Sequence, residues 1–333
     1  MKSTIFKTRR QLIASVGLMP IVGVPVAFAQ AESAFPERPI KLVVPNVAGG
    51  GADAIARQVA RKASEILGMP IVVDNRPGAG STIGADEASR AAPDGYTILW
   101  GDTTTFAIGP HVYPSARYDP RSSFEPITAM ISAPFMLVVS ERLQVKDVAS
   151  LIALAKAQPS KLNYGSAGAA TPHHIAMELF RQKAGLNITH VPYKGEAPAV
   201  QDLLGGNIDL MFASANSAIA HHASGSLRIL GSSGNLRSPR LPDIQTLHEQ
   251  GLTGYNYSVW HAVVAPASTP ASIVAKLNGA FVQASRSPEV TNWIAANTAA
   301  SVISGSATSL KELIATDYLK YRDVVKMANI VAS

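Results

Sequence analysis

Short apolar runs alternate with helical patterns from residue 40 to residue 100. Residues 40–45 read as a strand, and residues 52–67 read as a helix because apolar positions recur every three to four residues. Gly68 then stands where a glycine commonly ends a helix. The pattern continues with a strand at 70–75, a helix at 81–92 and a strand at 96–100. This β-α-β-α-β order predicts parallel strands joined by right-handed crossovers.

A second alternating block follows a long extended segment at 127–140. Its predicted strands cover residues 162–165, 188–192, 208–212 and 227–231, and its predicted helices cover 147–158, 172–183, 197–204 and 217–222. Another extended segment at 255–266 leads into the remainder, which reads as helices at 270–285, 288–297 and 309–327 with a short strand at 300–303.

Two alternating blocks joined by two extended crossings predict one α/β domain inserted into another. Domain 1 holds residues 36–132 and 262–333, and domain 2 holds residues 133–261. In such an arrangement the crossings act as a hinge, and a ligand binds in the cleft between the domains.

The loop Val47–Gly51 joins the first strand to the first helix and holds three consecutive glycines. Backbone N–H groups at a helix N-terminus have no intrahelical partner and favour an anion. No lysine or arginine lies between Leu42 and Asp53, so an anion here would be held by the backbone. The Gly-Lys-Ser/Thr ending of a phosphate loop is missing. The stretch Gly78–Gly84 imitates a dinucleotide fingerprint with one residue too many in its last spacing, so we expect no nucleotide and no other cofactor.

Asp53 has two interpretations that are compatible with each other. It can be a carboxylate in the first helical turn that pairs with Arg57 four residues on. It can also lie in the cleft and fix polar groups of the ligand or a water molecule.

The stretch from Asn163 to His174 repeats the opening theme in domain 2. A strand ends, small residues follow, and Thr171 can cap a helix whose first position is Pro172. Ser166 adds a hydroxyl group. Tyr164 stands where the nucleophile elbow Gly-x-Ser-x-Gly needs its first glycine, which disfavours a hydrolase. A secreted serine hydrolase that uses Ser166 and a histidine stays as an alternative.

Histidines occur as the pairs His173-His174 and His221-His222 and as His261 beside a tryptophan. Neighbouring residues on a helix point about 100° apart, so one pair rarely supplies two ligands to a metal ion. We therefore expect no metal site. Tyr164, Tyr193 and Trp260 are aromatic residues of the kind that usually pack in a core; Tyr193 follows a strand end, where exposure in the cleft is plausible.

Composition and charge indicate an exported protein. Of 333 residues, 47% are hydrophobic and 16% charged, enough to build a packed core. Basic residues precede an apolar segment that ends in Ala27-Phe28-Ala29, which predicts a signal peptide over residues 1–29 and a periplasmic location; Arg9-Arg10 resembles a twin-arginine signal. Removing its four basic residues lowers the formal charge from +6 to +2, so the charge does not indicate nucleic acid. The chain has no cysteine and needs no disulfide.

Several blocks of the sequence, in order, resemble one known family. They are PERPIKLVVP with the glycine loop, VVDNRPGAGSTIGAD, APDGYTIL, NYGSAG, VPYKGEAPAVQDLLGGNIDLMF and VVAPASTPASIVAKLN. These blocks are similar to those of the Bug-type extracytoplasmic solute receptors of tripartite tricarboxylate transporters. The resemblance covers nearly the whole chain after the signal peptide.

The resemblance implies a type II-like periplasmic binding protein, two α/β domains that close like a Venus flytrap on a carboxylate. It implies no catalysis and delivery of the ligand to a membrane permease; we expect a monomer. The ligand-binding positions it implies are Val47, Ala48, Gly49, Gly50, Ala52 and Asp53 in domain 1 and Ser166, Ala167, Gly168, Ala170 and Thr171 in domain 2, bordered by Thr103, Thr104, Thr105, Tyr193, Lys194 and Gly195.

Some positions depart from the family's pattern, and they bear on the ligand's distal end. Asn46 stands where an aromatic residue is usual, the segment 212–216 lacks an early acidic or amide residue, and His173 and His261 are unusual. His173 and Asn216 therefore join the expected ligand-binding set. Di- and tricarboxylates and aromatic acids such as benzene dicarboxylates are all candidates, and nearby aromatic residues favour an aromatic acid. A ligand sensor that acts through a membrane signalling partner is a further alternative.

Overall fold

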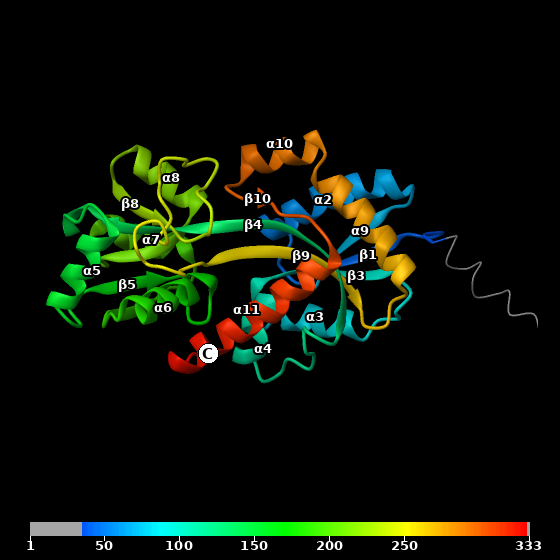
Figure 1. Ribbon diagram of the computed structural model, residues 1–333, viewed down its shortest axis with the longest axis horizontal. Helices are drawn as coiled ribbons and strands as arrows, with labels where there is room; N and C mark the ends of the chain where they lie inside the picture. The colour runs from blue at the N-terminus through cyan, green and yellow to red at the C-terminus, as the bar shows by residue number, and fades with distance from the viewer. Residues whose placement is uncertain (1–34, 332–333) are drawn as a thin grey trace, which may run out of the picture. The chain divides into compact units, whose positions relative to one another are not determined.

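The computed structural model describes residues 35–331, and the chain from Pro36 onward forms one compact unit (Figure 1). The predicted signal peptide lies outside the described residues. Within residues 35–331, no helix combines the length and the apolar character that a membrane crossing requires.

The first alternating block folds as its pattern predicts. It contains β1 (Ile40–Val44), α2 (Gly51–Leu67), β2 (Ile71–Asn75), α3 (Thr82–Ser89) and β3 (Thr97–Asp102). Gly68 ends α2 in the left-handed conformation, at φ 70°. After β3 the chain forms a single π-helical turn, η1 (Thr104–Ile108), that continues as α4 (Gly109–Val112).

The second block begins with the long strand β4 (Phe124–Ser140), which starts three residues earlier than predicted. It is followed by η2 (Glu141–Leu143), α5 (Val148–Ala157), β5 (Asn163–Ser166), α6 (Pro172–Ala184), β6 (Thr189–Pro192), α7 (Glu196–Gly205), β7 (Leu210–Ser214), α8 (Ala215–Ala223) and β8 (Leu227–Ser232). The chain closes with β9 (Ser258–Pro266), α9 (Ala271–Ser285), α10 (Pro288–Asn297), β10 (Ser301–Val302) and α11 (Ala307–Met327).

The strands form one connected sheet in the order β2-β1-β3-β9-β4-β7-β5-β6, with β8 and β10 paired to β4. β1 is parallel to β2 and β3, and β5 is parallel to β6 and β7, which confirms the predicted parallel pairing. We call β2, β1, β3, β9, β10 and residues 124–134 of β4 the first part of the sheet. Residues 135–140 of β4 with β7, β5, β6 and β8 are the second part.

The registers bring the carboxyl ends of both parts to the middle of β4. The end of β3 pairs with His261 on β9, and His261 pairs with Ile131 on β4. The end of β7, Ser214, pairs with Phe135 on β4. Ile131 and Phe135 are four residues apart, which is about 13 Å along an extended strand. The loops that follow the parallel strands of both parts therefore start near the same short stretch of β4.

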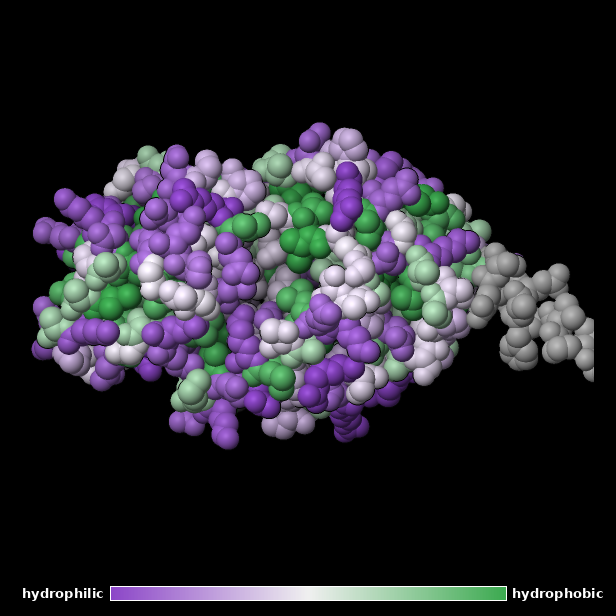
Figure 2. Space-filling view, viewed as in Figure 1, coloured by the Kyte–Doolittle hydropathy of each residue, from purple (hydrophilic) through white to green (hydrophobic). Residues whose placement is uncertain are grey.

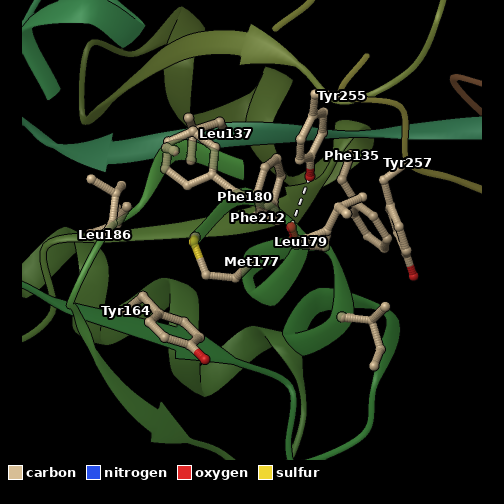
Figure 3. Packing of buried hydrophobic residues seen from close by; sticks show 14 of the residues in the cluster. Phe135, Leu137, Tyr164, Met177, Leu179, Phe180, Leu186, Phe212, Tyr255 and Tyr257 are labelled. Atoms are coloured by element: carbon tan, nitrogen blue, oxygen red, sulfur yellow. Dashed lines mark hydrogen bonds between the residues drawn. The ribbon is translucent and has the colours of Figure 1, made fainter. Parts of the chain in front are cut away.

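Side chains of β4 alternate between two hydrophobic clusters. Phe135, Leu137 and Val139 point into one cluster with α6, while Met136 and Val138 point into another with α7 and α8. Figure 3 shows the first cluster, where Phe180 and Phe212 lie beside Tyr255. This alternation buries both faces of the second part.

Helix α11 belongs to the cores of both parts. Its first half places Leu310 and Ile314 in a cluster with residues of η1, β3, β4 and β9, and its second half places Tyr321 and Val324 in the cluster around Phe135. In Figure 1, α11 crosses in front of β9. The helix therefore straps the two parts together.

Three buried tyrosines in this region differ in their hydrogen bonds, which predicts different effects on the free energy of unfolding when each is replaced. The Tyr255 hydroxyl donates to the Ala176 carbonyl at 2.8 Å (Figure 3), while the hydroxyl groups of Tyr257 and Tyr321 are buried with no hydrogen-bond partner. Tyr255→Phe should lower the free energy of unfolding by about 1 kcal/mol. Tyr257→Phe and Tyr321→Phe should leave it unchanged or raise it, because each removes an unsatisfied polar group. Urea unfolding of the three variants checks this, and equal losses in all three would contradict it.

Candidate functional site

The glycine loop after β1 presents its backbone to solvent. Val47 is 64% exposed, Ala48 and Gly49 are exposed, and Gly50 and Ala52 are half-buried. Gly50 is the N-cap of α2 and has no side chain to cap it. Helix geometry leaves the first N–H groups of α2 without an intrahelical partner. These donors, at the positive end of the helix dipole, suit a small anion.

Asp53 holds this loop in shape from inside. Its side chain is 2% exposed; Oδ2 accepts from the Gly49 N–H at 2.8 Å and from Arg57 Nε at 2.9 Å. Its other oxygen accepts from Asn75 Nδ2 at 2.9 Å, and the same nitrogen contacts the Asn46 carbonyl. Both carboxylate oxygens are engaged within the protein, so the structure supports the first interpretation of Asp53, a carboxylate in the first helical turn that pairs with Arg57.

The charge of Asp53 is stabilised where it lies. Burial raises the pKa of the carboxyl, but hydrogen bonds from Arg57, the Gly49 N–H and Asn75 outweigh it and hold the pKa below its ordinary value. The carboxylate is therefore ionised at neutral pH and keeps the loop backbone turned outward.

The three threonines after β3 differ in role. Thr103 is fully buried, and its hydroxyl accepts from the Trp260 N–H at 2.9 Å. Thr105 is fully buried and bonded to Asp102. Thr104 is half-buried, so it is the one of the three with surface to offer a ligand.

Ser166, at the end of β5, is buried and fully engaged. It is 0% exposed, its Oγ lies 2.7 Å from His190 Nε2 and 3.0 Å from the Gly168 carbonyl, and it accepts from the Gly168 N–H. Its hydroxyl shapes the loop 167–171 and does not reach solvent. Ala167 and Gly168 are half-buried, and Ala169 is exposed.

Two stacked imidazoles support this second loop. The rings of His174 and His190 lie 3.9 Å apart, with the ring of Tyr164 stacked on His190 at 4.8 Å. His174 Nδ1 accepts from the N–H of Ala170, a buried residue held at the strained φ of 61°. Only a neutral His174 can accept this bond.

Both histidines resist protonation. Burial lowers the pKa of His174 to about 3, with His190 and Arg181 as further causes. Burial, followed by Arg181, lowers the pKa of His190 to about 4. The imidazoles are therefore neutral under ordinary conditions, and the hydrogen bonds that shape the loop persist.

Thr171 occupies the N-cap position of α6, but the prediction that its side chain caps the helix is wrong. Its hydroxyl donates to the Gly168 carbonyl at 2.7 Å, and no side-chain cap bond forms. Pro172 has no N–H, which leaves the N–H groups of His173 and His174 as orphan donors. The second loop therefore offers the same kind of anion site as the glycine loop.

His173 lies at the start of α6 beside a half-buried carboxylate, that of Glu196. Its ring packs on Phe135 at 4.7 Å, and Nε2 is 3.5 Å from Glu196. Burial raises the pKa of the Glu196 carboxyl, but His173 and the Ser214 N–H, which donates at 2.7 Å, hold it below its ordinary value. The pair ties α6, α7 and β7 together at the carboxyl edge of the second part.

The remaining predicted ligand-binding residues differ in exposure and in their hydrogen bonds. The Tyr193 hydroxyl donates to Asp202 at 2.6 Å; burial and this carboxylate raise its pKa to about 12. Lys194 is exposed. Asn216 is exposed at the start of α8, but its amide is bonded to the Asn297 carbonyl and to Arg240.

His261, which was expected to approach the ligand, lies in the core, and so does Trp260, an aromatic residue of the kind that usually packs there. His261 is 7% exposed, and its Nδ1 accepts from Trp100 Nε1 at 3.1 Å. Trp260 is 2% exposed, donates to Asp317 and stacks on Phe106 at 5.7 Å. The expectation that His261 approaches the distal end of a ligand is therefore wrong, because β9 turns it inward. Within residues 35–331, no group of three or more histidines, carboxylates or cysteines lies close enough to hold a metal ion.

Sequence reasoning missed the residues that brace the two loops. Asn75 ends β2 and Glu196 follows β6, both within the blocks that resemble the receptor family, whereas His190 lies inside β6 just before one of these blocks. For Asn75 and Glu196, the position near the carboxyl end of a strand was the available signal. The partners of all three come from other helices and strands, which a single sequence does not show.

Comparison with known proteins identifies the family. Residues 55–330 match the tripartite tricarboxylate transporter family receptor. The chain belongs to this family. BugT of Bordetella pertussis is 33% identical over 317 residues, which cover 95% of this chain and 97% of BugT. The resemblance to Bug-type receptors is thereby confirmed.

Solved structures of family members have the same fold. Rpa4515 of R. palustris, solved with adipate, is 33% identical, has a TM-score of 0.73, and the match covers 89% of this chain and 99% of that one. MatC of Rhodopseudomonas palustris, solved with malate, is 29% identical with a TM-score of 0.70 and coverage of 87% and 100%. The fold is the α/β fold of periplasmic solute-binding proteins, as predicted.

The neutral histidine stack predicts how stability depends on pH. Unfolded histidines take up protons near pH ~6.5, whereas His190 and His174 do so only near pH 4 and 3 when folded. The unfolded state therefore binds more protons between pH ~4 and 6.5, and the free energy of unfolding should fall as the pH falls through this window, by at least ~1 kcal/mol.

Urea unfolding from pH 7.5 to 5 measures this slope above the range in which carboxylates titrate. His190→Gln should flatten the slope, whatever its absolute stability. His221→Gln, a half-buried position on α8, is the matched control and should keep the wild-type slope. Equal slopes in all three proteins would refute the role given to the stack.

Proposed function

We propose that the protein is a periplasmic solute-binding receptor that captures a carboxylate between the glycine loop and the loop 167–171. Membership of the receptor family supports this function. The main support for the site is the position of the strand ends: the carboxyl ends of strands from both parts of the sheet align with Ile131–Phe135 of β4. Two uncapped helix N-termini, at α2 and α6, follow strands of these two parts.

The grip on the carboxylate is made by backbone N–H groups. The polar side chains within both loops, Asp53 and Ser166, are engaged inside the protein and leave the backbone free. A carboxylate would accept hydrogen bonds from the start of α2 on one side and from the start of α6 on the other. The side chains of Thr104 and Lys194 also have surface for the ligand's other groups.

We propose an aliphatic dicarboxylate as the ligand class. The solved relatives with adipate and with malate support this class. The preference for an aromatic acid rested on nearby aromatic residues, and the structure removes most of that reason. Trp260 and Tyr164 lie in the core, and the Tyr193 hydroxyl is bonded to Asp202.

The proposal includes two domains and a hinge. Residues 36–132 and 262–333 form one domain and residues 133–261 the other, with the extended segments 127–140, in β4, and 255–266, which includes β9, as crossings. Capture requires that the ligand bind the closed arrangement better than the open one. The closed receptor, a monomer exported by its signal peptide, would deliver the ligand to the membrane permease of a tripartite tricarboxylate transporter.

The hydrolase alternative has little support in this geometry. Ser166 is 0% exposed, and its hydroxyl is shared between His190 and the Gly168 backbone. A nucleophile must reach the substrate, and a general base works best with a pKa near the operating pH. The depressed pKa of His190, about 4, does not meet the second requirement.

A binding screen tests the function. Thermal shift and calorimetry with malate, succinate, adipate, citrate and benzene dicarboxylates should show stabilisation by at least one aliphatic dicarboxylate; ligand at 100 times Kd stabilises by about 2.7 kcal/mol. A matched amide, in which no carboxylate remains, should have no effect. Absence of stabilisation by every carboxylate would reject the receptor proposal.

A matched pair of glycine substitutions tests the backbone grip. Gly49 in the loop and Gly68 at the end of α2 both have positive φ, 80° and 70°, and open space where a Cβ would lie. Alanine at either position should destabilise the protein by a similar amount, about 1 kcal/mol. Only Gly49→Ala should also weaken ligand binding, by about tenfold or more, because it alters the loop that holds the anion. Equal affinities in the two variants would contradict a grip at this loop.

A further inference from the structure

Besides β4 and β9, two helices of the first part contact the second part. The two contacts differ in size and polarity. One lies at α11, on the face of the second part that contains Phe135 and Leu137. The other lies at the end of α10, on the opposite face, which contains Met136 and Val138. The second part is therefore held from both sides.

The α11 contact is large and apolar. Tyr321, Val324, Val325 and Ile330 are buried in the same cluster as Phe135. Each fully buried apolar side chain of this size contributes roughly 1.5–3 kcal/mol. Gln182 on α6 also donates to the Val324 carbonyl at 3.4 Å. Parting the two parts here would expose a continuous core.

The α10 contact is small and polar. Asn216 Nδ2, in the first turn of α8, donates to the Asn297 carbonyl at 3.1 Å, and Arg240 Nη1 donates to Asn216 Oδ1 at 2.8 Å. Ala299, just beyond α10, is buried beside Ala215 and Ala218 of α8. One small apolar side chain and one exposed hydrogen bond cross between α8 and α10; the bond from Arg240 stays within residues 133–261 and orients the Asn216 amide.

The packing next to the α10 contact is incomplete. A cavity of about 250 Å³ separates the loop 234–239 from β10 and α11. Its lining includes Trp260, Ile303 and Leu313, and Leu236 lies at its rim with 78% exposure. Apolar surface is visible near β10 in the space-filling view (Figure 2). The loop 234–239 therefore packs loosely against β10 and the first half of α11.

We infer that Asn216 is a positioning residue that holds the receptor closed; we call it the latch. The receptor opens when α8 moves away from α10. Helix α11 stays in place and acts as the pivot. The asymmetry of the two contacts fixes which side opens. Asn216 follows the carboxyl end of β7 by two residues, so the latch lies at the edge where the proposed ligand loops start. The role of this latch in ligand capture rests on the proposed function.

The latch connects physically to both ligand loops. On the first part, Arg61 of α2 pairs with Glu289 of α10, and Lys62 lies 3.8 Å from the same carboxylate. On the second part, the Ser214 N–H donates to Glu196, which lies beside His173 at the start of α6. Opening of the latch would move α2 and α6, and the anion sites at their starts, away from each other.

Distances between spin labels in the ligand-free protein test the inference. The chain has no cysteine, so introduced cysteines are the only labelling sites. Ala220→Cys on α8 with Ala296→Cys on α10 reports the latch side, and Lys183→Cys on α6 with Lys326→Cys on α11 reports the pivot side; all four positions are exposed.

The latch variants are Asn216→Ala and Asn216→Asp, and Asn297→Ala is their matched control. Asn297 accepts through its backbone carbonyl, so replacing its side chain keeps the acceptor. Asn216→Ala should shift the ratio of short to long α8–α10 distances toward long by about 2- to 10-fold, as expected for one hydrogen bond. Asn216→Asp should shift it further, because a carboxylate would face a carbonyl at the negative end of α10.

The α6–α11 distance should not change in any variant, and Asn297→Ala should match the wild type. If Asn216→Ala matches the wild type, or if the α6–α11 distance lengthens with it, the latch and pivot are wrong. With a bound dicarboxylate, Asn216→Ala should raise the dissociation rate by a similar factor at nearly unchanged thermal stability. The distances are measured without ligand, whereas carboxylate capture is measured by binding. The two experiments can therefore fail independently of each other.

Discussion

Strand β4 is the constraint on which the rest of the structure depends. It pairs with β9 along its first eleven residues and with β7 and β8 along its last six, so both parts of the sheet take their register from it. Its alternating side chains feed two clusters on opposite faces of the second part. The end of β3 aligns with the middle of β4 through β9, and the end of β7 pairs with it directly. Hydrogen-bond register therefore places the carboxyl-end loops of both parts near this stretch, with no need for direct contact between them.

The two loops use the same physical device with different supports. In the glycine loop a buried carboxylate, Asp53, accepts from the backbone on its inner side. In the second loop a neutral imidazole, His174, accepts from Ala170, and Ser166 is bonded to His190. Each support satisfies inner polar groups and leaves the helix N-terminus uncapped. Polar side chains, one of them charged, thus shape the loops, and the proposed carboxylate site is left to the backbone N–H groups.

Local patterns predicted most of the fold, and long-range partners explain what they missed. Helix α2, the end of α2 at Gly68 and the parallel order followed from apolar spacing and turn residues, which act within a few residues. The identity of α11 as a strap could not be predicted, because its two halves bury different partners from distant segments. The partners of Thr171 and His261 could not be predicted either. The Thr171 hydroxyl donates to the Gly168 carbonyl and does not cap the helix, and β9 turns His261 toward Trp100. The small residues of both loops were identifiable from sequence, and the role of Asp53 was not decided until its partners were placed.

The central claim is that one carboxylate is held by backbone N–H groups from both parts of the sheet at once. A crystal structure of the protein with a bound aliphatic dicarboxylate tests it most directly. The account predicts carboxylate oxygens at about 2.7–3.2 Å from backbone nitrogens in both the residues that start α2 and the residues that start α6. A carboxylate held only by side chains, or by donors from one part alone, would contradict it.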